Sequence, residues 1–198
     1  MMIEFDKNYA KDGYVCGIDE AGRGPLFGPV VVASCVMSLK DEDIIAGVND
    51  SKKLTEKKRE RLYEEIIQKA IAYHIAFVDA KRIDEINILQ ATIEGMKECA
   101  TALGVKVNAV LVDGNPVDLG IESINVVHGD AKSYHIAAAS ILAKVARDRY
   151  IREIAEQYPN YDLKSHKGYG TSKHREELKQ FGPSDLHRMS FIKNIDRW

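Results

Sequence analysis

The chain has 198 residues, of which 45% are hydrophobic and 29% are charged, and this composition excludes an intrinsically disordered protein. Its 28 basic and 30 acidic side chains give a net charge of −2, so no overall basic field exists and any polyanion must meet a local patch. The length predicts a single domain over residues 1–198, with a helix and loop subregion from about 159 to 198.

Strands and helices are predicted in the order β-β-α-β-α-β-β-α. Apolar, β-prone segments predict strands at residues 14–19, 29–37, 75–78, 107–113 and 124–127. Helical periodicity predicts helices from the N-cap Thr55 to residue 74, at 83–103, at 134–158, and a short final helix around 176–180. This order predicts an α/β fold with a central mixed five-stranded sheet flanked by helices and a small helical C-terminal part.

The cysteines and the lack of long apolar runs indicate the compartment. Cys16, Cys35 and Cys99 are odd in number and too widely spaced for a zinc ligand pair, so we expect reduced thiols in the core. The N-terminal segment has no secretory apolar region, and nowhere do about 18 apolar residues follow one another. We therefore expect a cytoplasmic protein that does not contact a membrane.

Acidic residues stand where predicted strands end. Asp19 and Glu20 follow the first strand, Asp113 ends the fourth, and Asp130 follows the fifth. Ligands of open α/β sheets bind at the carboxyl ends of the strands, so we expect these carboxylates to share a cleft. Their mutual repulsion would raise their pKa values unless divalent cations were bound.

Oxygen ligands of this kind suit Mg²⁺ or Mn²⁺ rather than zinc. Two such ions can activate a water and stabilise a leaving oxygen at phosphorus, which predicts phosphodiester hydrolysis with Asp19 shared by both ions. The alternative is that aspartates in Asp-Gly and Gly-Asp pairs only form turns.

A glycine-rich loop follows the first acidic pair. Its spacing does not match a dinucleotide-binding loop, and it leads into a strand rather than a helix. Gly22 and Gly24 would let the backbone approach a sugar-phosphate closely, while Arg23 would bind a phosphate. The alternative is a tight turn with an exposed arginine.

Basic residues gather in three groups that could together follow both backbones of a duplex, although each alone is usually a solvated face. The groups are Lys52, Lys53, Lys57, Lys58, Arg59 and Arg61; Lys144, Arg147, Arg149 and Arg152; and Lys164, His166, Lys167, Lys173 and Arg175. Our candidates for phosphate contact are Ser51, Lys52, Lys53, Ser140 and Lys144. Tyr169 lies on a basic, glycine-rich loop, where it either packs against a sugar or base or is an ordinary loop tyrosine.

The remaining polar residues are weaker candidates for a role in the cleft. We expect Asp148 to form an ion pair on its helix and His74 to be packed in the core. We expect His135, His166 and His174 to be polar neighbours of the cleft.

Taken in order, the segments GIDEAGRGPLFGPVVVA, DSKKLT, VDGN, GDAKSYHIAAASILAKVARDR and HKGYGT resemble the bacterial ribonuclease HII family, a type 2 ribonuclease H, over about residues 14 to 190. The resemblance implies a ribonuclease H-like fold whose metal centre consists of Asp19, Glu20, Asp113 and Asp130. It also implies that Gly22, Arg23, Gly24 and Tyr169 recognise the 2′-hydroxyl and the RNA-to-DNA step.

The activity implied by this resemblance is endonucleolytic cleavage of the RNA strand of RNA/DNA hybrids. It includes cleavage on the 5′ side of single ribonucleotides in duplex DNA, leaving a 3′-hydroxyl and a 5′-phosphate, in ribonucleotide and primer removal. We expect two Mg²⁺ or Mn²⁺ ions with substrate bound, a monomer, and no clear sliding-clamp peptide at the terminus.

Other interpretations remain open. The related ribonuclease HIII is disfavoured because Asp19 comes too early for its extra N-terminal domain and the loop carries Arg23 instead of a lysine. Another metal nuclease of the same general fold, such as a resolvase or exonuclease, would not discriminate ribose. In a noncatalytic duplex-binding module the carboxylates would only form turns.

Overall fold

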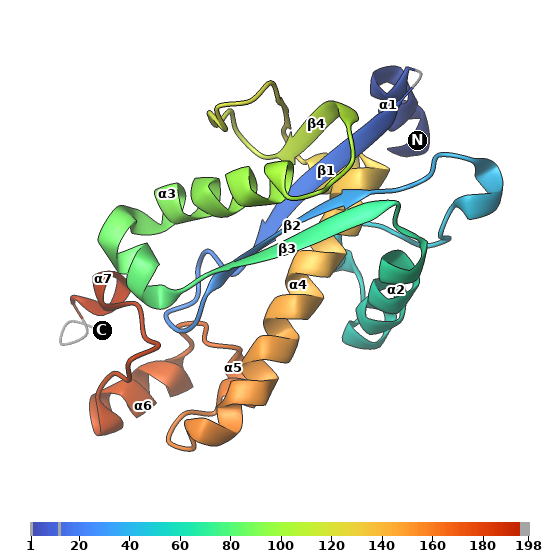
Figure 1. The fold of residues 1–198 in the computed structure, drawn as a ribbon. Coiled ribbons are helices and arrows are strands. Elements are labelled where there is room, and N and C mark those ends of the chain that lie inside the picture. The colour runs from blue at the N-terminus through green and yellow to red at the C-terminus, as the bar shows by residue number, and fades with distance from the viewer. Residues whose placement is uncertain (1, 12, 195–198) are drawn as a thin grey trace.

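The computed structural model describes residues 2–11 and 13–194 (Figure 1). Its strands are β1 (Tyr14–Ala21), β2 (Val30–Val36), β3 (Ala72–Val78), β4 (Val107–Asp113) and β5 (Ile124–Val126). Its helices are α1 (Met2–Ala10), α2 (Glu56–Lys69), α3 (Ala80–Thr101), α4 (Tyr134–Ile154), α5 (Leu163–His166), α6 (Ser172–Phe181) and α7 (Met189–Ile192).

The strands form one sheet in the order β3-β2-β1-β4-β5. Strand β2 runs antiparallel to β1 and β3, whereas β4 runs parallel to β1 and β5. The predicted mixed five-stranded sheet is confirmed. Because β1 and β4 are parallel neighbours, their carboxyl ends lie at the same edge of the sheet.

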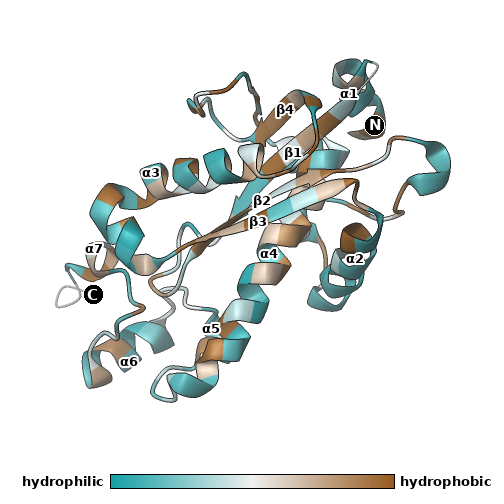
Figure 2. Ribbon diagram, viewed as in Figure 1, coloured by the Kyte–Doolittle hydropathy of each residue, from teal (hydrophilic) through white to brown (hydrophobic). Residues whose placement is uncertain are grey.

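Helices cover both faces of this sheet (Figure 1). Helices α2 and α4 share a hydrophobic cluster with β2, and α3 shares a second cluster with β1, β2 and β4. Figure 2 shows α2 as a mainly hydrophilic helix, which fits a helix with one face on the core and the other in water. The predicted N-cap of α2 is confirmed, since the Thr55 side chain accepts a hydrogen bond from the Lys58 amide.

Helix α4 crosses β1 at very short range. A Cβ atom built on Gly17 would lie 2.2 Å from the carbonyl carbon of His135 and 2.3 Å from the amide nitrogen of Ile136. Alanines at 137–139 and 143 keep the buried side of the helix narrow. This close approach holds the helix beside the end of β1, where Asp19 lies.

The predicted helix from Thr55 to residue 74 is wrong at its end. Helix α2 stops at Lys69, and Ala72–Val78 is strand β3, which pairs with β2 along its whole length. Helical periodicity around residue 70 could not reveal this, because the competing hydrogen bonds come from a distant strand.

The C-terminal part contains more helix than predicted. The predicted short helix extends over Ser172–Phe181 with Thr171 as its N-cap, and it is not the final one, because α7 follows. Helices α1 and α5 were not predicted. The helix predicted at 134–158 becomes a 3-10 turn at Ala155–Gln157.

Helix α3 begins earlier than predicted. Its N-cap is Asp79, whose side chain accepts a hydrogen bond from the Arg82 amide, and it bends at Asn87, where φ is 68°. The helix ends at Thr101, two residues before the predicted end at 103, and Gly104 beyond it has a φ of 68°.

The cysteines are free and buried, which confirms the prediction of core thiols. Burial raises the pKa of Cys16 and of Cys99 to about 12, so both thiols stay protonated at neutral pH. The prediction for His74 is wrong: its side chain is 32% exposed and lies 2.9 Å from Glu98 Oε1, because β3 is an edge strand. Within the described residues, every helix is too short or too polar to cross a bilayer.

The contact between β1 and α4 predicts the effect of a single methyl group. Gly17→Ala forces strand and helix apart and should lower the free energy of unfolding by about 3 kcal/mol, as for an overpacked core. Gly104→Ala is the control, because its new Cβ would meet nothing within 4 Å and would add only the strain of a left-handed backbone, about 1 kcal/mol. Urea denaturation measures both values, and equal losses would contradict the close packing of α4 on β1.

Candidate active site

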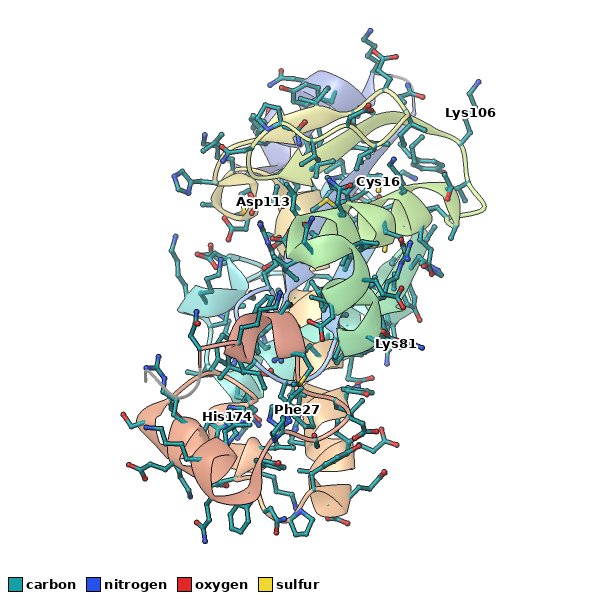
Figure 3. All side chains as sticks on the ribbon, turned by 90° about the vertical axis from the view of Figure 1, so that its left-hand side faces the viewer. Cys16, Phe27, Lys81, Lys106, Asp113 and His174 are labelled. Atoms are coloured by element: carbon teal, nitrogen blue, oxygen red, sulfur yellow. The ribbon has the colours of Figure 1, made fainter. Side chains whose placement is uncertain are left out.

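The parallel pairing of β1 and β4 brings acidic side chains together. Ile18 of β1 pairs with Val112 of the parallel strand β4. Asp19 and Asp113 directly follow these two residues and therefore lie side by side. One carboxylate oxygen each from Asp19, Asp113 and Asp130 lies within 4.8 Å of the other two. Three residues that are far apart in the sequence therefore form one cluster, the carboxylate cluster. Figure 3 shows Asp113 in the sheet part of the molecule, above His174 of the C-terminal part and above Phe27, which lies beside it in the loop between β1 and β2.

Backbone hydrogen bonds hold these carboxylates. Asp113 Oδ1 accepts a hydrogen bond of 2.6 Å from the Gly129 amide, which ties β4 to the turn that carries Asp130. A Cβ atom on Gly129 would lie 3.0 Å from that oxygen and 2.6 Å from Ile136 Cδ1, so a larger residue would require both side chains to shift. Asp19 Oδ1 accepts a hydrogen bond of 2.7 Å from the Glu20 amide.

Ionisation is disfavoured for Asp19 and Asp130 of the carboxylate cluster and for the adjoining Glu20. Burial, together with the charges of Glu20 and Asp113, raises the pKa of Asp19 well above its usual value. Burial and then the Asp113 charge raise the pKa of Asp130. Burial also raises the pKa of Glu20, although nearby Arg23 opposes the shift. A bound cation would remove this repulsion, and a set of carboxylate oxygens fits a hard divalent ion such as Mg²⁺ or Mn²⁺.

Glu20 stands beside the carboxylate cluster rather than within it. Its Oε1 atom lies 3.4 Å from a guanidinium nitrogen of Arg23. The structure thus brings three of the four predicted carboxylates within mutual reach and places the fourth on the adjoining wall.

A pocket of about 230 Å³ adjoins these carboxylates. Its walls contain most of the residues predicted to bind substrate, namely Gly22, Arg23, Ser51, Lys52, Ser140, Lys144 and Tyr169, together with Ala21 and the predicted metal ligand Glu20. Gly24 lies at its rim, where a Cβ would be 3.9 Å from Tyr169 Cε1. Lys53 does not line the pocket and instead lies 3.7 Å from Asp50 Oδ2.

The candidate phosphate contacts are anchored in different ways. The hydroxyl groups of Ser51 and Ser140 are 2.8 Å apart, and Lys144 Nζ lies 2.7 Å from Asp148, which confirms the predicted ion pair of Asp148. The Lys52 side chain is 81% exposed, and its Nζ lies 3.7 Å from Asp130 Oδ2. Burial lowers the pKa of Lys52, but the charges of Asp130 and Asp19 outweigh it and raise the pKa.

Two buried arginines support the pocket from behind, and neither was predicted to do so. Arg188 donates hydrogen bonds to the carbonyl groups of Gly22, Arg23 and Gly28, at 2.7, 2.8 and 2.9 Å. Burial and then the charge of Arg147 lower the pKa of Arg188 to about 9, so it remains a cation at pH 7.

Arg147 was predicted to follow a duplex, and this is wrong. It is fully buried and donates to the carbonyl groups of Phe27, Pro29 and Lys167. The apolar neighbours of Arg147 in the helical pattern could have signalled its burial. Gly22, with φ of 90°, packs against it so closely that a Cβ would lie 2.1 Å from Arg147 Nε.

Ion pairs with acidic side chains occupy several more of the basic residues that were predicted to follow a duplex. Arg149 bonds to Glu60 and Glu64, and Arg152 also bonds to Glu60. Further pairs are Arg61 with Glu65, Lys164 with Glu156, and Lys173 with Asp162. The remaining basic residues near the carboxylates are fewer than the sequence suggests.

The histidines predicted beside the cleft do not line the pocket. His135 is buried and bonds to Asp6 Oδ2, at 2.6 Å, and to the Met37 carbonyl. His166 and His174 are buried in the C-terminal part, behind the loop of Tyr169.

The repulsion within the carboxylate cluster predicts that removing a charge stabilises the metal-free protein. Because the pKa of Asp19 is raised on folding, stability falls as the pH rises from its unfolded pKa to its folded pKa. At pH 7 in EDTA, Asp19→Asn should therefore raise the free energy of unfolding by about 0.5 to 2 kcal/mol, the usual range for a stabilising substitution.

Denaturant titration in EDTA and in Mg²⁺ measures this effect, and Mg²⁺ should remove the advantage of the variant. Asp118→Asn is the matched control, because Asp118 is exposed and, within residues 2–11 and 13–194, accepts a hydrogen bond only from the Gly120 amide. Equal free energies of unfolding for the wild type and Asp19→Asn in EDTA would contradict the repulsion between the carboxylates.

Known proteins resemble the chain over nearly its whole length. The family model described as Ribonuclease HII matches residues 16–194. A ribonuclease HII of Caldicellulosiruptor bescii is 54% identical over 98% of this chain and 94% of its own length. The crystal structure of the ribonuclease H2 from Pyrococcus horikoshii OT3 is 32% identical, covers 93% of this chain and 97% of its own, and has a TM-score of 0.77.

An RNase HII of Archaeoglobus fulgidus, solved in a complex with PCNA, is also 32% identical, with a TM-score of 0.73 over 89% of this chain and 94% of its own. These matches confirm the resemblance and the ribonuclease H-like fold. The chain belongs to the ribonuclease HII family of ribonuclease H hydrolases, which cleave the RNA of RNA/DNA hybrids.

Proposed function

We propose that the protein is an endonuclease that also cuts on the 5′ side of single ribonucleotides in duplex DNA. The products carry a 3′-hydroxyl and a 5′-phosphate. The observation that carries this proposal is the position of the carboxylate cluster beside a pocket whose wall includes Gly22, Arg23 and Tyr169. Such a site joins a group suited to phosphodiester hydrolysis with a loop suited to sensing ribose.

Asp19, Asp113 and Asp130 would hold two divalent ions, Mg²⁺ or Mn²⁺, with Glu20 completing the set from the neighbouring wall. When bound, the ions would activate the attacking water and stabilise the leaving oxygen. Carboxylate ligands leave coordination positions for substrate phosphate, so full occupancy is expected with the hybrid bound. The exposed ammonium group of Lys52 is placed to attract that phosphate.

The backbone at Gly22–Gly24 offers donors for a hydroxyl group. Arg188 binds the carbonyl groups of Gly22 and Arg23, and the peptide bonds of the described residues are all trans. A trans peptide unit directs its N–H opposite to its C=O, so the amides of Arg23 and Gly24 point away from Arg188. We assign these amides to the 2′-hydroxyl, the group that distinguishes ribose from deoxyribose.

Tyr169 faces this loop across the pocket. Its side chain is 42% exposed, and its ring lies 5.7 Å from the guanidinium carbon of Arg147. A half-exposed ring beside the backbone of Gly24 suits the sugar of the next nucleotide. We therefore assign to Tyr169 the recognition of the RNA-to-DNA step.

The proposed substrates are RNA/DNA hybrids and DNA duplexes containing ribonucleotides. The proposed roles are ribonucleotide and primer removal in the cytoplasm, by a monomer that forms one domain over residues 1–198. A sliding-clamp peptide at the terminus is not part of the proposal, and residues 195–198 lie outside the described part of the chain.

A substrate panel tests the proposed reaction. We expect Mg²⁺- or Mn²⁺-dependent cleavage of a long RNA/DNA hybrid and of a DNA duplex with one ribonucleotide, no cleavage of the matched all-DNA duplex, and none in EDTA. Asp113→Asn should lower the cleavage rate by more than about a hundredfold. This loss exceeds the usual one when a residue that only hydrogen-bonds to a metal ligand is replaced. Mapping of the product ends is the measurement. Cleavage of all-DNA would instead indicate a nuclease that does not discriminate ribose.

The assigned role of Tyr169 predicts a selective defect. Tyr169→Ala should lower kcat/KM for the single-ribonucleotide duplex about tenfold to a hundredfold, the usual range for a lost stacking contact. Cleavage of the long hybrid should fall by a smaller factor. Tyr73→Ala is the matched control, since Tyr73 has the same 42% exposure but lies on the edge strand β3. Equal losses on both substrates would reject the assignment.

A further inference from the structure

Two buried histidines connect Tyr169 to the segment before α7. His174 Nδ1 lies 3.0 Å from the Tyr169 carbonyl oxygen, and His174 Nε2 lies 3.1 Å from His187 Nε2. At the other end, His187 Nδ1 lies 2.9 Å from the Ser184 amide. These contacts form a continuous chain of hydrogen bonds, the histidine chain, and nothing in the reaction above uses it.

The groups at the two ends of the histidine chain determine which nitrogen atoms donate hydrogen bonds and which accept them. A carbonyl oxygen only accepts and a backbone amide only donates, so His174 Nδ1 carries a proton and His187 Nδ1 does not. The two Nε2 atoms can bond to each other only if one donates and the other accepts. With both rings neutral, His187 Nε2 carries the proton and His174 Nε2 accepts it.

A charge on either ring would break the histidine chain. A second proton on His174 would point at the proton of His187 Nε2. A second proton on His187 would sit on Nδ1, where it could bond to the Ser184 hydroxyl at 2.8 Å but would remove the bond from the Ser184 amide. Burial and the neighbouring His166 lower the pKa of His174 to about 4, and burial and His174 lower that of His187 to about 3, so both rings are neutral at pH 7. The other titratable groups around the pair are Tyr161, Glu177 and Asp185.

The histidine chain joins both walls of the substrate pocket. The Phe27 ring packs edge-on against His187 at 4.9 Å, and Phe27 and His187 form an isolated antiparallel bridge. The Leu26 amide bonds at 2.8 Å to the Gly168 carbonyl, directly before Tyr169. The loop that carries Gly22 and the loop that carries Tyr169 therefore share one buried support.

We propose that His174 and His187 are positioning residues that fix Tyr169 for recognition of the RNA-to-DNA step, through a hydrogen-bond chain of fixed direction. This inference rests on the role proposed for Tyr169. His174 acts on the backbone of Tyr169, and His187 acts by holding His174 in the tautomer that donates to it.

The tautomers can be measured in the unaltered protein. At pH 7, ¹⁵N spectra of the histidine side chains should show His174 protonated at Nδ1 only and His187 protonated at Nε2 only. The opposite tautomer at either residue, or a cationic ring, would overturn the inference. This measurement does not depend on activity.

Two substitutions of His174 test the consequence for cleavage. His174→Phe keeps a ring but removes the donor, and His174→Asn keeps a donor at the position of Nδ1. His174→Phe should lower kcat/KM for the single-ribonucleotide duplex about tenfold, as for one lost hydrogen bond, with a smaller loss on the long hybrid. His174→Asn should recover most of this loss. Equal losses on both substrates, or no recovery with asparagine, would overturn the positioning role.

A double variant shows whether His174 acts through Tyr169. Tyr169→Ala combined with His174→Phe should show the same ratio of kcat/KM between the two substrates as Tyr169→Ala alone, because the residue being positioned is already absent. Independent, multiplied losses would overturn only the positioning role. An unchanged substrate ratio in Tyr169→Ala alone would overturn the proposed function of Tyr169 and the positioning role with it.

Discussion

The parallel pairing of β1 with β4 is the constraint on which the site depends. It places Asp19 and Asp113 on adjacent strands at one edge of the sheet, and the bond from the Gly129 amide to Asp113 adds the turn of Asp130. Three carboxylates are thereby held together, and burial and repulsion by neighbouring carboxylates disfavour the charges of Asp19 and Asp130. The hydrophobic clusters on both faces of the sheet keep the strands in register despite this repulsion. A local cost of this kind is typical of a functional site supported by the rest of its fold.

The walls of the pocket depend on buried cations instead of regular secondary structure. Arg147 and Arg188 each bind three carbonyl groups of the loops behind the pocket. A buried guanidinium group without partners would be strongly destabilising, and a buried carbonyl group without a donor also carries a cost. The guanidinium groups and the carbonyl groups satisfy each other's hydrogen-bonding capacity. The conformation of the irregular loops is therefore held by hydrogen bonds, as it is in strands. The proposed recognition of one hydroxyl group requires well-ordered loops, because hydrogen bonds weaken steeply with poor geometry.

Ion pairs decide where positive charge remains available. Between α2 and α4, Arg149 and Arg152 are matched by Glu60 and by further glutamates on α2. Such surface pairs contribute little to stability, but they neutralise a face that would otherwise attract phosphate. Lys52 differs, because its partner Asp130 belongs to the carboxylate cluster and a bound cation would compete for that partner. A bound cation would thus leave the ammonium group of Lys52 available to a phosphate, in a protein with a net charge of −2.

Local pattern was sufficient to locate the strands and the acidic residues at their ends, although it assigned the first three residues of β3 to a helix. Apolar runs and turn residues gave β4 its observed bounds, and the position of Asp19 and Asp113 after such runs indicated a shared edge. The histidine and arginine roles could not be predicted, because a side chain's partners are distant backbone groups that no local pattern contains. The sequence by itself determined which residues were available for metal and substrate. Only the tertiary structure decided that Arg147 is internal, that His74 is exposed and that Glu20 stands beside the carboxylate cluster, because burial and pairing arise from contacts between segments far apart in the chain.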